Sequence, residues 1–167
     1  LRAYFNAFAA GFHADTRMTT EHPLPHLGDW AGDHFKTSDE AQSAYWLRLM
    51  FIYEEAETLY FGYALPRYWL RPGSRVSIDR ARTYFGETGV SYEVSDTGRV
   101  IVARITPPTR TPPSNIRIRL RHAEAKPIRS VRVNGAQWED FDREFVHVPA
   151  TTSPLEVVAS FGGPAKR

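Results

Sequence analysis

The residues best suited to chemistry lie in one short segment, from residue 21 to residue 36. A pair of carboxyl groups can carry out general acid–base chemistry when one is protonated and the other is ionised. Asp29 and Asp33 are the candidate catalytic residues, and Trp30 lies between them in the sequence. The alternative interpretation is that both aspartates cap turns around Gly28 and Gly32. The spacing leaves both interpretations open.

The same segment holds groups that suit the binding of a sugar. An aromatic ring covers the C–H face of a pyranose at little entropic cost, which makes Trp30 and Phe35 candidate stacking residues. His26, His34 and Glu21 are candidate partners for sugar hydroxyls, and the alternative for the histidines is that they tie the loop together. No spacing here matches a strong metal-ligand pattern such as HExxH. Neither a metal nor another cofactor is therefore predicted.

A helix is predicted on each side of this segment. Before it, apolar residues recur at helical spacing over residues 1–14; they are Leu1, Phe5, Phe8 and Phe12. After it, Thr37 to Glu40 has the pattern of a capping box, in which the threonine and the glutamate cap the first turn of a helix. We expect this second helix to run to about Glu55, so that the two helices and the long loop form a hairpin.

The second helix is apolar in nearly every direction, with Arg48 as the one interruption. A helix without a polar face is buried inside a larger body. We therefore expect Tyr45, Trp46 and Tyr53 to lie in a core, and we expect most of that core to come from outside this chain.

From residue 58 the apolar period changes to two, which is the period of a half-buried strand. The alternating runs are short and are separated by turn sequences, of which Asn134-Gly135 is the strongest hairpin signal. Seven or more short strands at regular spacing predict an antiparallel β-sandwich. The predicted fold class is α+β, with a helical hairpin over residues 1–57 followed by the sandwich over residues 58–167.

One predicted strand alternates arginine with apolar residues, so that Arg117, Arg119 and Arg121 share a face. Such a row is usually solvated or paired with acids on a neighbouring strand. The alternative is that it binds an anionic polysaccharide by bidentate contacts.

Composition and charge limit the possible partners. The chain has no cysteine, which excludes disulfides and thiol chemistry, and no signal peptide is recognisable, so that periplasm, cytoplasm and extracellular space all remain open. No apolar run reaches the roughly 18–20 residues of a membrane span. Residues 1–57 hold 4 Lys/Arg against 9 Asp/Glu, and residues 58–167 hold 17 against 10. The arginines of the basic part are scattered, so neither a nucleic acid nor a membrane is expected as a partner.

Three stretches together resemble the C-terminal ends of bacterial six-hairpin, or (α/α)6-barrel, glycoside hydrolases. They are LGDWAGDHFKTSDEAQSAYWLRLMFIYEE (27–55), TLYFGYALPRYWL (58–70) with RARTYFGETGVSYEV (80–94), and IRIRLRHAEAKPIRSVRVNGAQWEDFD (116–142). In that family a toroid of six helical hairpins carries the active site, and a β-sandwich commonly accompanies it. The resemblance covers most of the chain and is specific to the architecture, not to a substrate.

The resemblance implies that residues 1–57 are the last hairpin of a toroid whose other hairpins, and at least one catalytic carboxylate, lie upstream. The expected partners are a poly- or oligosaccharide and the upstream helical barrel of the same protein. The loop of residues 21–40 would contribute to the glycan site, and the isolated chain would show no turnover. The alternatives are a carbohydrate-binding sandwich that uses Trp69 or Trp138, a purely structural closing domain, and a fragment of a polysaccharide lyase.

Overall fold

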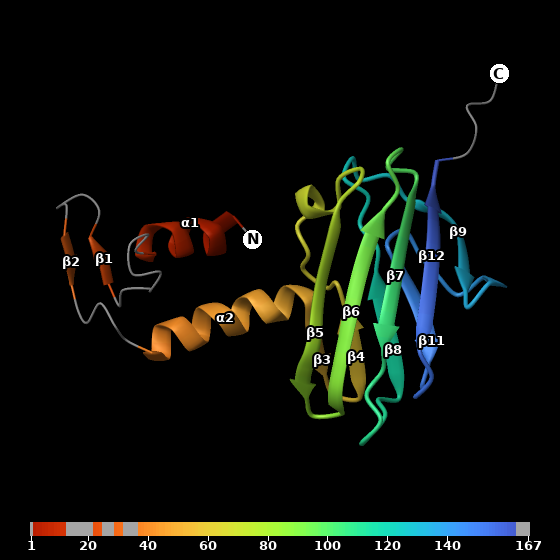
Figure 1. Ribbon diagram of the computed structural model, residues 1–167, viewed down its shortest axis with the longest axis horizontal. Helices are drawn as coiled ribbons and strands as arrows, with labels where there is room; N and C mark the ends of the chain where they lie inside the picture. Colours follow the sequence, from red (N-terminus) through yellow and green to blue (C-terminus); the bar gives the residue numbers. More distant parts are fainter. Residues whose placement is uncertain (1, 13–21, 25–28, 32–36, 163–167) are drawn as a thin grey trace. The chain divides into compact units, whose positions relative to one another are not determined.

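The computed structural model describes residues 2–12, 22–24, 29–31 and 37–162, and it shows a mixed α+β fold (Figure 1). The chain divides into two compact units, Leu1–Leu47 and Arg48–Arg167. The division falls inside the second helix, ten residues before the boundary at residues 57 and 58 that the sequence pattern indicated. Each unit is described by itself.

The N-terminal unit contains helix α1 (Arg2–Gly11) and most of helix α2 (Thr37–Phe51). Two three-residue strands, β1 (His22–Leu24) and β2 (Asp29–Ala31), pair antiparallel in the segment that the sequence pattern indicated as a loop. The hydroxyl of Tyr4 on α1 donates to the carbonyl of Ser43 on α2 at 3.2 Å, and its ring meets that of Trp46 edge-on at 5.9 Å. The assignment of these helices to a toroid hairpin stays a prediction.

Three adjacent apolar residues in the middle of α2 are exposed, whereas Met50 and Phe51 at its end are buried. Tyr45 is 50% exposed, Trp46 43% and Leu47 40%. The prediction that Tyr45 and Trp46 lie in a core is therefore not met by the residues present here.

Helix α2 ends at Phe51, so the prediction of a helix through Glu55 is wrong. Residues Ile52–Glu55 form strand β3, which pairs antiparallel with β4 (Thr58–Phe61). Ala56 takes a positive φ of 50° in the turn between the two strands. The pairing is favoured because Ile52, opposite Phe61, is β-branched and becomes fully buried.

The C-terminal unit is built from two sheets that pack face to face (Figure 1). The six-stranded sheet has the order β10-β9-β12-β7-β6-β5, and the four-stranded sheet has the order β11-β8-β4-β3. The remaining strands are β5 (Arg75–Thr83), β6 (Gly86–Val94), β7 (Val100–Thr106), β8 (Asn115–Arg119), β9 (Ile128–Val133), β10 (Ala136–Trp138), β11 (Phe145–Pro149) and β12 (Leu155–Phe161). A short 3-10 helix, η2 (Arg67–Leu70), follows β4.

The core lies between the two sheets, where alternate residues of each strand are buried. The fully buried residues include Leu59, Ile116 and Ile118 of the four-stranded sheet. They also include Tyr92 and Ile101 of the six-stranded sheet. The expectation of strands with period two is confirmed. The sheets are not purely antiparallel, however, because β4 and β8 pair in parallel.

Candidate functional site

Most of the site residues expected from the sequence lie outside the described residues. Glu21, His26, Asp33, His34 and Phe35 belong to this group. Asp29 and Trp30 lie in β2, where their backbones pair with Leu24 and Pro23. The catalytic and sugar-binding roles expected for all seven residues stay predictions.

The described residues instead bring a cluster of rings together on the outer face of the four-stranded sheet. We call it the aromatic shelf, and it consists of Tyr53, Tyr60, Tyr63 and Phe145. The shelf forms because β3, β4, β8 and β11 turn their alternate residues away from the core. Strand register then aligns one row across the sheet, since Tyr53 lies opposite Tyr60, Tyr60 opposite Arg117, and Arg117 opposite His147.

The rings of the shelf support one another. Tyr53 and Tyr63 stack with centroids 4.8 Å apart, and Tyr63 meets Tyr60 edge-on at 5.2 Å. Phe145 lies 6.5 Å from both Tyr60 and Tyr63. Tyr60 is consequently only 8% exposed although it lies on an outer face, whereas Tyr63 is 39% exposed. Tyr63 is therefore the most exposed ring of the shelf.

Polar groups border the shelf. The guanidinium of Arg117 lies over the ring of Tyr60 at 5.7 Å, and that side chain is exposed. The Tyr60 hydroxyl donates to Glu55 at 3.1 Å; burial first, and this hydrogen bond second, raise the pKa of Tyr60. On the other side of Arg117, Nδ1 of His147 lies 3.1 Å from a carboxylate oxygen of Asp140.

Next to the shelf, three arginines surround one buried carboxylate, that of Glu144. Arg67 hydrogen-bonds one oxygen of Glu144, and Arg119 bonds the other with Nε at 2.9 Å and Nη2 at 2.8 Å. The Nε of Arg121 lies 3.6 Å from the second oxygen. The expectation that the arginine row pairs with acids is thus confirmed for Arg119 and Arg121.

The same arginines fasten the chain that follows β4 to the sheet. Arg119 donates to the carbonyl of Tyr63 at 2.7 Å, Arg121 to that of Leu65 at 2.8 Å, and Arg67 to that of His122 at 2.8 Å. The position of Tyr63 in the shelf therefore depends on the arginine cluster.

The charge of the cluster does not cancel. Burial by itself would raise the pKa of Glu144, but the hydrogen bond from Arg67 and the charge of Arg119 outweigh it, and the pKa of Glu144 lies below its usual value. Glu144 therefore carries one negative charge against three guanidinium groups. Among these four side chains, positive charges therefore outnumber negative ones.

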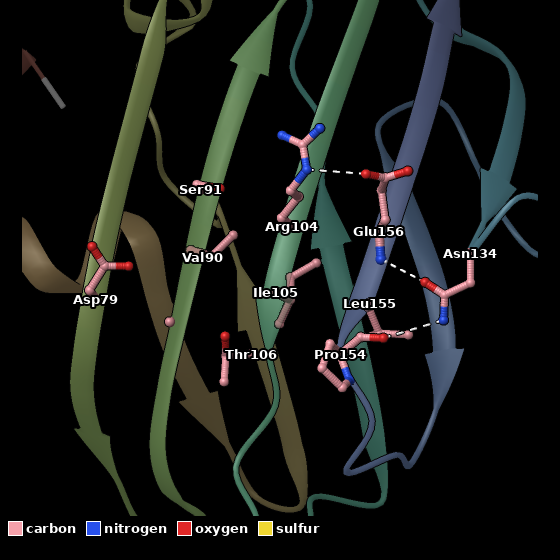
Figure 2. Close-up of a pocket in the computed structure, with 11 residues that line it drawn as sticks. Asp79, Val90, Ser91, Arg104, Ile105, Thr106, Asn134, Pro154, Leu155 and Glu156 are labelled. Atoms are coloured by element: carbon pink, nitrogen blue, oxygen red, sulfur yellow. Dashed lines mark hydrogen bonds and ion pairs between the residues drawn. The ribbon is translucent and has the colours of Figure 1, made fainter.

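A second surface lies on the outer face of the six-stranded sheet, where an open groove of about 350 Å³ runs over β5, β6, β7 and β12 (Figure 2). Arg104 bridges Glu93 at 2.9 Å and Glu156 at 3.1 Å. The side chain of Asn134 accepts from the amide of Glu156 at 2.7 Å and donates to the carbonyl of Pro154 at 3.3 Å. No aromatic residue lines the groove, so it offers no ring on which a sugar could stack.

The two tryptophans expected to serve a carbohydrate-binding sandwich are half-buried and occupied elsewhere. The indole Nε1 of Trp138 donates to the carbonyl of His147 at 3.0 Å. Trp69 in η2 lies 6.1 Å from the ring of Phe51. Neither ring belongs to the shelf. Sequence reasoning missed the shelf because its members come from three segments that no local spacing relates.

Within the described residues, no three His, Cys, Asp or Glu side chains come together as ligands for a metal ion. Over the same residues, no helix combines the length and apolar character needed to cross a bilayer. Comparisons of the chain with protein-family models, with curated proteins and with solved structures found no match.

Proposed function

We propose that residues 48–167 form the glycan-binding accessory sandwich of a carbohydrate-active, glycoside hydrolase-like protein, with the aromatic shelf as its binding surface. The observation that carries the proposal is the ring of Tyr63, which is 39% exposed and is held in place by Tyr53 and Tyr60. An exposed, pre-oriented ring stacks on the apolar face of a sugar with little loss of side-chain entropy.

Hydrogen-bonding groups at the rim of the shelf complete a sugar site. Arg117 is exposed beside Tyr60, while Glu55 and Asp140 have free lone pairs beyond the single contacts that hold them. These groups alternate donors and acceptors around the rings, which matches the hydroxyl pattern of a saccharide.

The shelf offers binding without catalysis. Its two carboxylates are engaged at opposite ends of the shelf, Glu55 with the hydroxyl of Tyr60 and Asp140 with His147. Glycoside hydrolysis requires two carboxyl groups that face the same scissile bond, and we assign no such pair to the shelf. The isolated chain is therefore expected to bind glycans without turning them over.

The test is titration calorimetry of the 167-residue chain against a panel of oligosaccharides, some neutral and some acidic. Tyr63→Ala is expected to weaken binding at least about tenfold, as loss of one stacking ring does in other interfaces. Tyr84→Ala is the matched control, because Tyr84 is 86% exposed in the turn between β5 and β6 and is not part of the shelf. The proposal would be contradicted if Tyr63→Ala bound as tightly as wild type. It would also be contradicted if the wild-type chain bound no member of the panel.

A second proposal concerns helices α1 and α2, which we place as the last hairpin of a helical barrel whose remaining hairpins lie upstream. It is supported by the exposure of Tyr45, Trp46 and Leu47 on α2, because large adjacent apolar side chains usually mark a surface that another element covers. The first test is the reading frame upstream of residue 1, where further amphipathic hairpins are expected.

The second test compares Trp46→Ser in this chain and in the complete encoded polypeptide. Exposed residues tolerate such changes, so the chain alone should lose little stability. The complete polypeptide should lose several kcal/mol if upstream helices bury this ring, on the order of a core Trp truncation. Equal effects in both contexts would argue against a barrel. In the complete polypeptide, an unchanged activity of Asp33→Asn would likewise remove the loop of residues 21–40 from the catalytic site.

A further inference from the structure

The charged residues around the aromatic shelf indicate which chemical class of glycan it binds. We infer that the shelf selects a glycan that bears anionic groups, either carboxylates or sulfate esters, and that Arg117 is the residue that binds them. The inference rests on the proposed glycan-binding function of the shelf and narrows it to a class of ligand.

Arg117 is placed to bind an anion next to a sugar ring. It occupies an interior position of the four-stranded sheet, with Tyr60 on one side and His147 on the other. Its side chain is exposed, and its guanidinium carbon lies 5.7 Å from the ring centroid of Tyr60. A guanidinium beside an aromatic ring keeps its N–H groups available for bidentate binding of a carboxylate or sulfate.

The neighbouring arginines of the same row have carboxylate partners, and Arg117 has none among the described residues. Arg119 and Arg121 lie against Glu144 at 2.8 and 3.6 Å. The acids nearest to Arg117 in the shelf are engaged elsewhere, since Glu55 accepts from Tyr60 and Asp140 contacts His147. A ligand anion would therefore meet a guanidinium that no other described carboxylate neutralises.

A second observation points in the same direction. The cluster of Arg67, Arg119 and Arg121 holds three positive charges against the single charge of Glu144. Its edge lies on the shelf, because the guanidinium of Arg119 sits 5.1 Å from the ring centroid of Phe145. The Nε of Arg121 is buried and lacks a hydrogen-bond partner. The excess of arginine over carboxylate among these four side chains favours an anionic sugar over a neutral one beside the shelf.

A single-stranded nucleic acid also combines rings with negative charge, but the shelf suits it less well. Such ligands stack successive bases on several exposed rings along a basic groove. Here Tyr60 is covered by its neighbours and Tyr63 is the ring with substantial exposure.

The experiment measures binding of three forms of one oligosaccharide to the 167-residue chain by titration calorimetry. The first is an oligogalacturonate, the second is its carboxyl-reduced counterpart, and the third is the reduced form after sulfation. We expect at least one anionic form to bind about 10- to 100-fold more tightly than the reduced form, as a charge-assisted hydrogen bond contributes. The comparison of the two anionic forms identifies carboxylate or sulfate as the recognised group.

Two variants separate specific recognition from general attraction to a basic protein. Arg117→Gln should abolish the preference for the anionic form, because it weakens binding of that form far more than binding of the reduced form. Arg132→Gln removes the same charge from an exposed position on β9 and should leave the preference intact. Equal losses in both variants would overturn the inference, because they would show a non-specific effect of net charge.

The remaining outcomes distinguish this inference from the proposed function. If Tyr63→Ala abolishes binding but the anionic and reduced forms bind equally, the shelf binds glycans and the inference is wrong. If no form binds, or if Tyr63→Ala has no effect on binding, both the proposed glycan-binding function and the inference of an anionic ligand are wrong. Tighter binding of an oligothymidylate than of any sugar, lost in Arg117→Gln, would assign the shelf to nucleic acid and overturn the inference.

Discussion

Arg119 holds Glu144 with two nitrogens, Nε at 2.9 Å and Nη2 at 2.8 Å from the same carboxylate oxygen. The other oxygen of Glu144 accepts from Arg67, which lies in η2. Because Arg119 also donates to the carbonyl of Tyr63, this contact links the arginine cluster to the aromatic shelf. Glu144 thus helps to position Tyr63 through Arg119.

Loss of the carboxylate charge should destabilise the sandwich. Glu144→Gln leaves three guanidinium groups close together without a counter-charge, and removing one partner of a buried ion pair costs about 3 kcal/mol or more. Urea denaturation monitored by circular dichroism measures the effect. Glu139→Gln is the matched control, because Glu139 is exposed, and it should change stability by less than about 0.5 kcal/mol. A Glu144→Gln variant as stable as wild type would contradict this account of the cluster.

Stability should fall on mild acidification because of His122. Burial, followed by the nearby charge of Lys126, lowers the pKa of His122 from 6.5. Its Nδ1 accepts from the amide of Glu124 at 3.0 Å, a bond that protonation at Nδ1 removes. Between the lowered pKa and 6.5 the unfolded chain binds more protons, so the free energy of unfolding rises with pH in that window.

The His122 contribution is therefore fully present above pH 6.5, is lost as the pH falls below that value, and levels off below the lowered pKa. Thermal melts of wild type and His122→Gln between pH 5 and 8 measure the difference, since the other histidines are common to both proteins. The wild-type chain should show the steeper loss. Parallel curves for the two proteins would exclude His122 as the source.

The hydroxyl of Tyr92 should be a net cost to the fold. Tyr92 is fully buried, and its hydroxyl has no hydrogen-bond partner among the described residues. A buried unsatisfied polar group costs about 1–3 kcal/mol, so Tyr92→Phe should raise the free energy of unfolding by about 1 kcal/mol in urea titrations. Tyr60→Phe is the comparison, because the Tyr60 hydroxyl is bonded to Glu55 and its removal should not stabilise the protein. A destabilised Tyr92→Phe would show that the hydroxyl is satisfied.

Two glycines with positive φ should differ in their tolerance of a methyl group. Gly135 has a φ of 83° and open space around it, so Gly135→Ala should cost only the strain of the left-handed conformation, about 1 kcal/mol. Gly62 has a φ of 70°, and an added Cβ would lie 2.4 Å from the Tyr92 hydroxyl and 2.8 Å from the Arg119 carbonyl. Gly62→Ala should therefore cost well over that amount. Equal melting temperatures for the two variants would refute the steric argument.

Combining Gly62→Ala with Tyr92→Phe tests the same contact independently. The removal of the hydroxyl relieves the shortest clash but not that with the Arg119 carbonyl. The double variant should recover part of the loss, giving a coupling energy of about 0.5–3 kcal/mol, as contacting residues do. Strict additivity would mean that the two residues do not interact.

Local patterns predicted the strands well and the helix boundary poorly. The alternation in residues 116–120 and the Asn134-Gly135 pair act between sequence neighbours, and both were confirmed as β8 and as the turn between β9 and β10. The apolar run before residue 55 has no clear period, so the pattern of residues 52–55 is compatible with a helix or a strand. These residues form a strand because they pair with β4.

For the candidate sites too, local sequence patterns predicted some features and could not predict contacts between distant residues. The expectation that the arginine row meets acids follows from alternation, but the identity of the acid does not, because Glu144 lies 25 residues from Arg119. The roles expected for Asp29, Asp33 and their neighbours remain predictions. The shelf had no sequence motif, since no local spacing relates Tyr53 and Tyr63 to Phe145.

By itself, the sequence determined the α+β class, the inward and outward sides of the strands, and the tight turns, because each depends on residues within a few positions of one another. The tertiary structure alone decided which outward side chains meet. Tyr60 and Arg117 become neighbours through the parallel pairing of β4 with β8, and three arginines share Glu144 because the chain after β4 folds back over β8. Such contacts follow from strand register and loop closure, which are set by the packing of the whole sandwich.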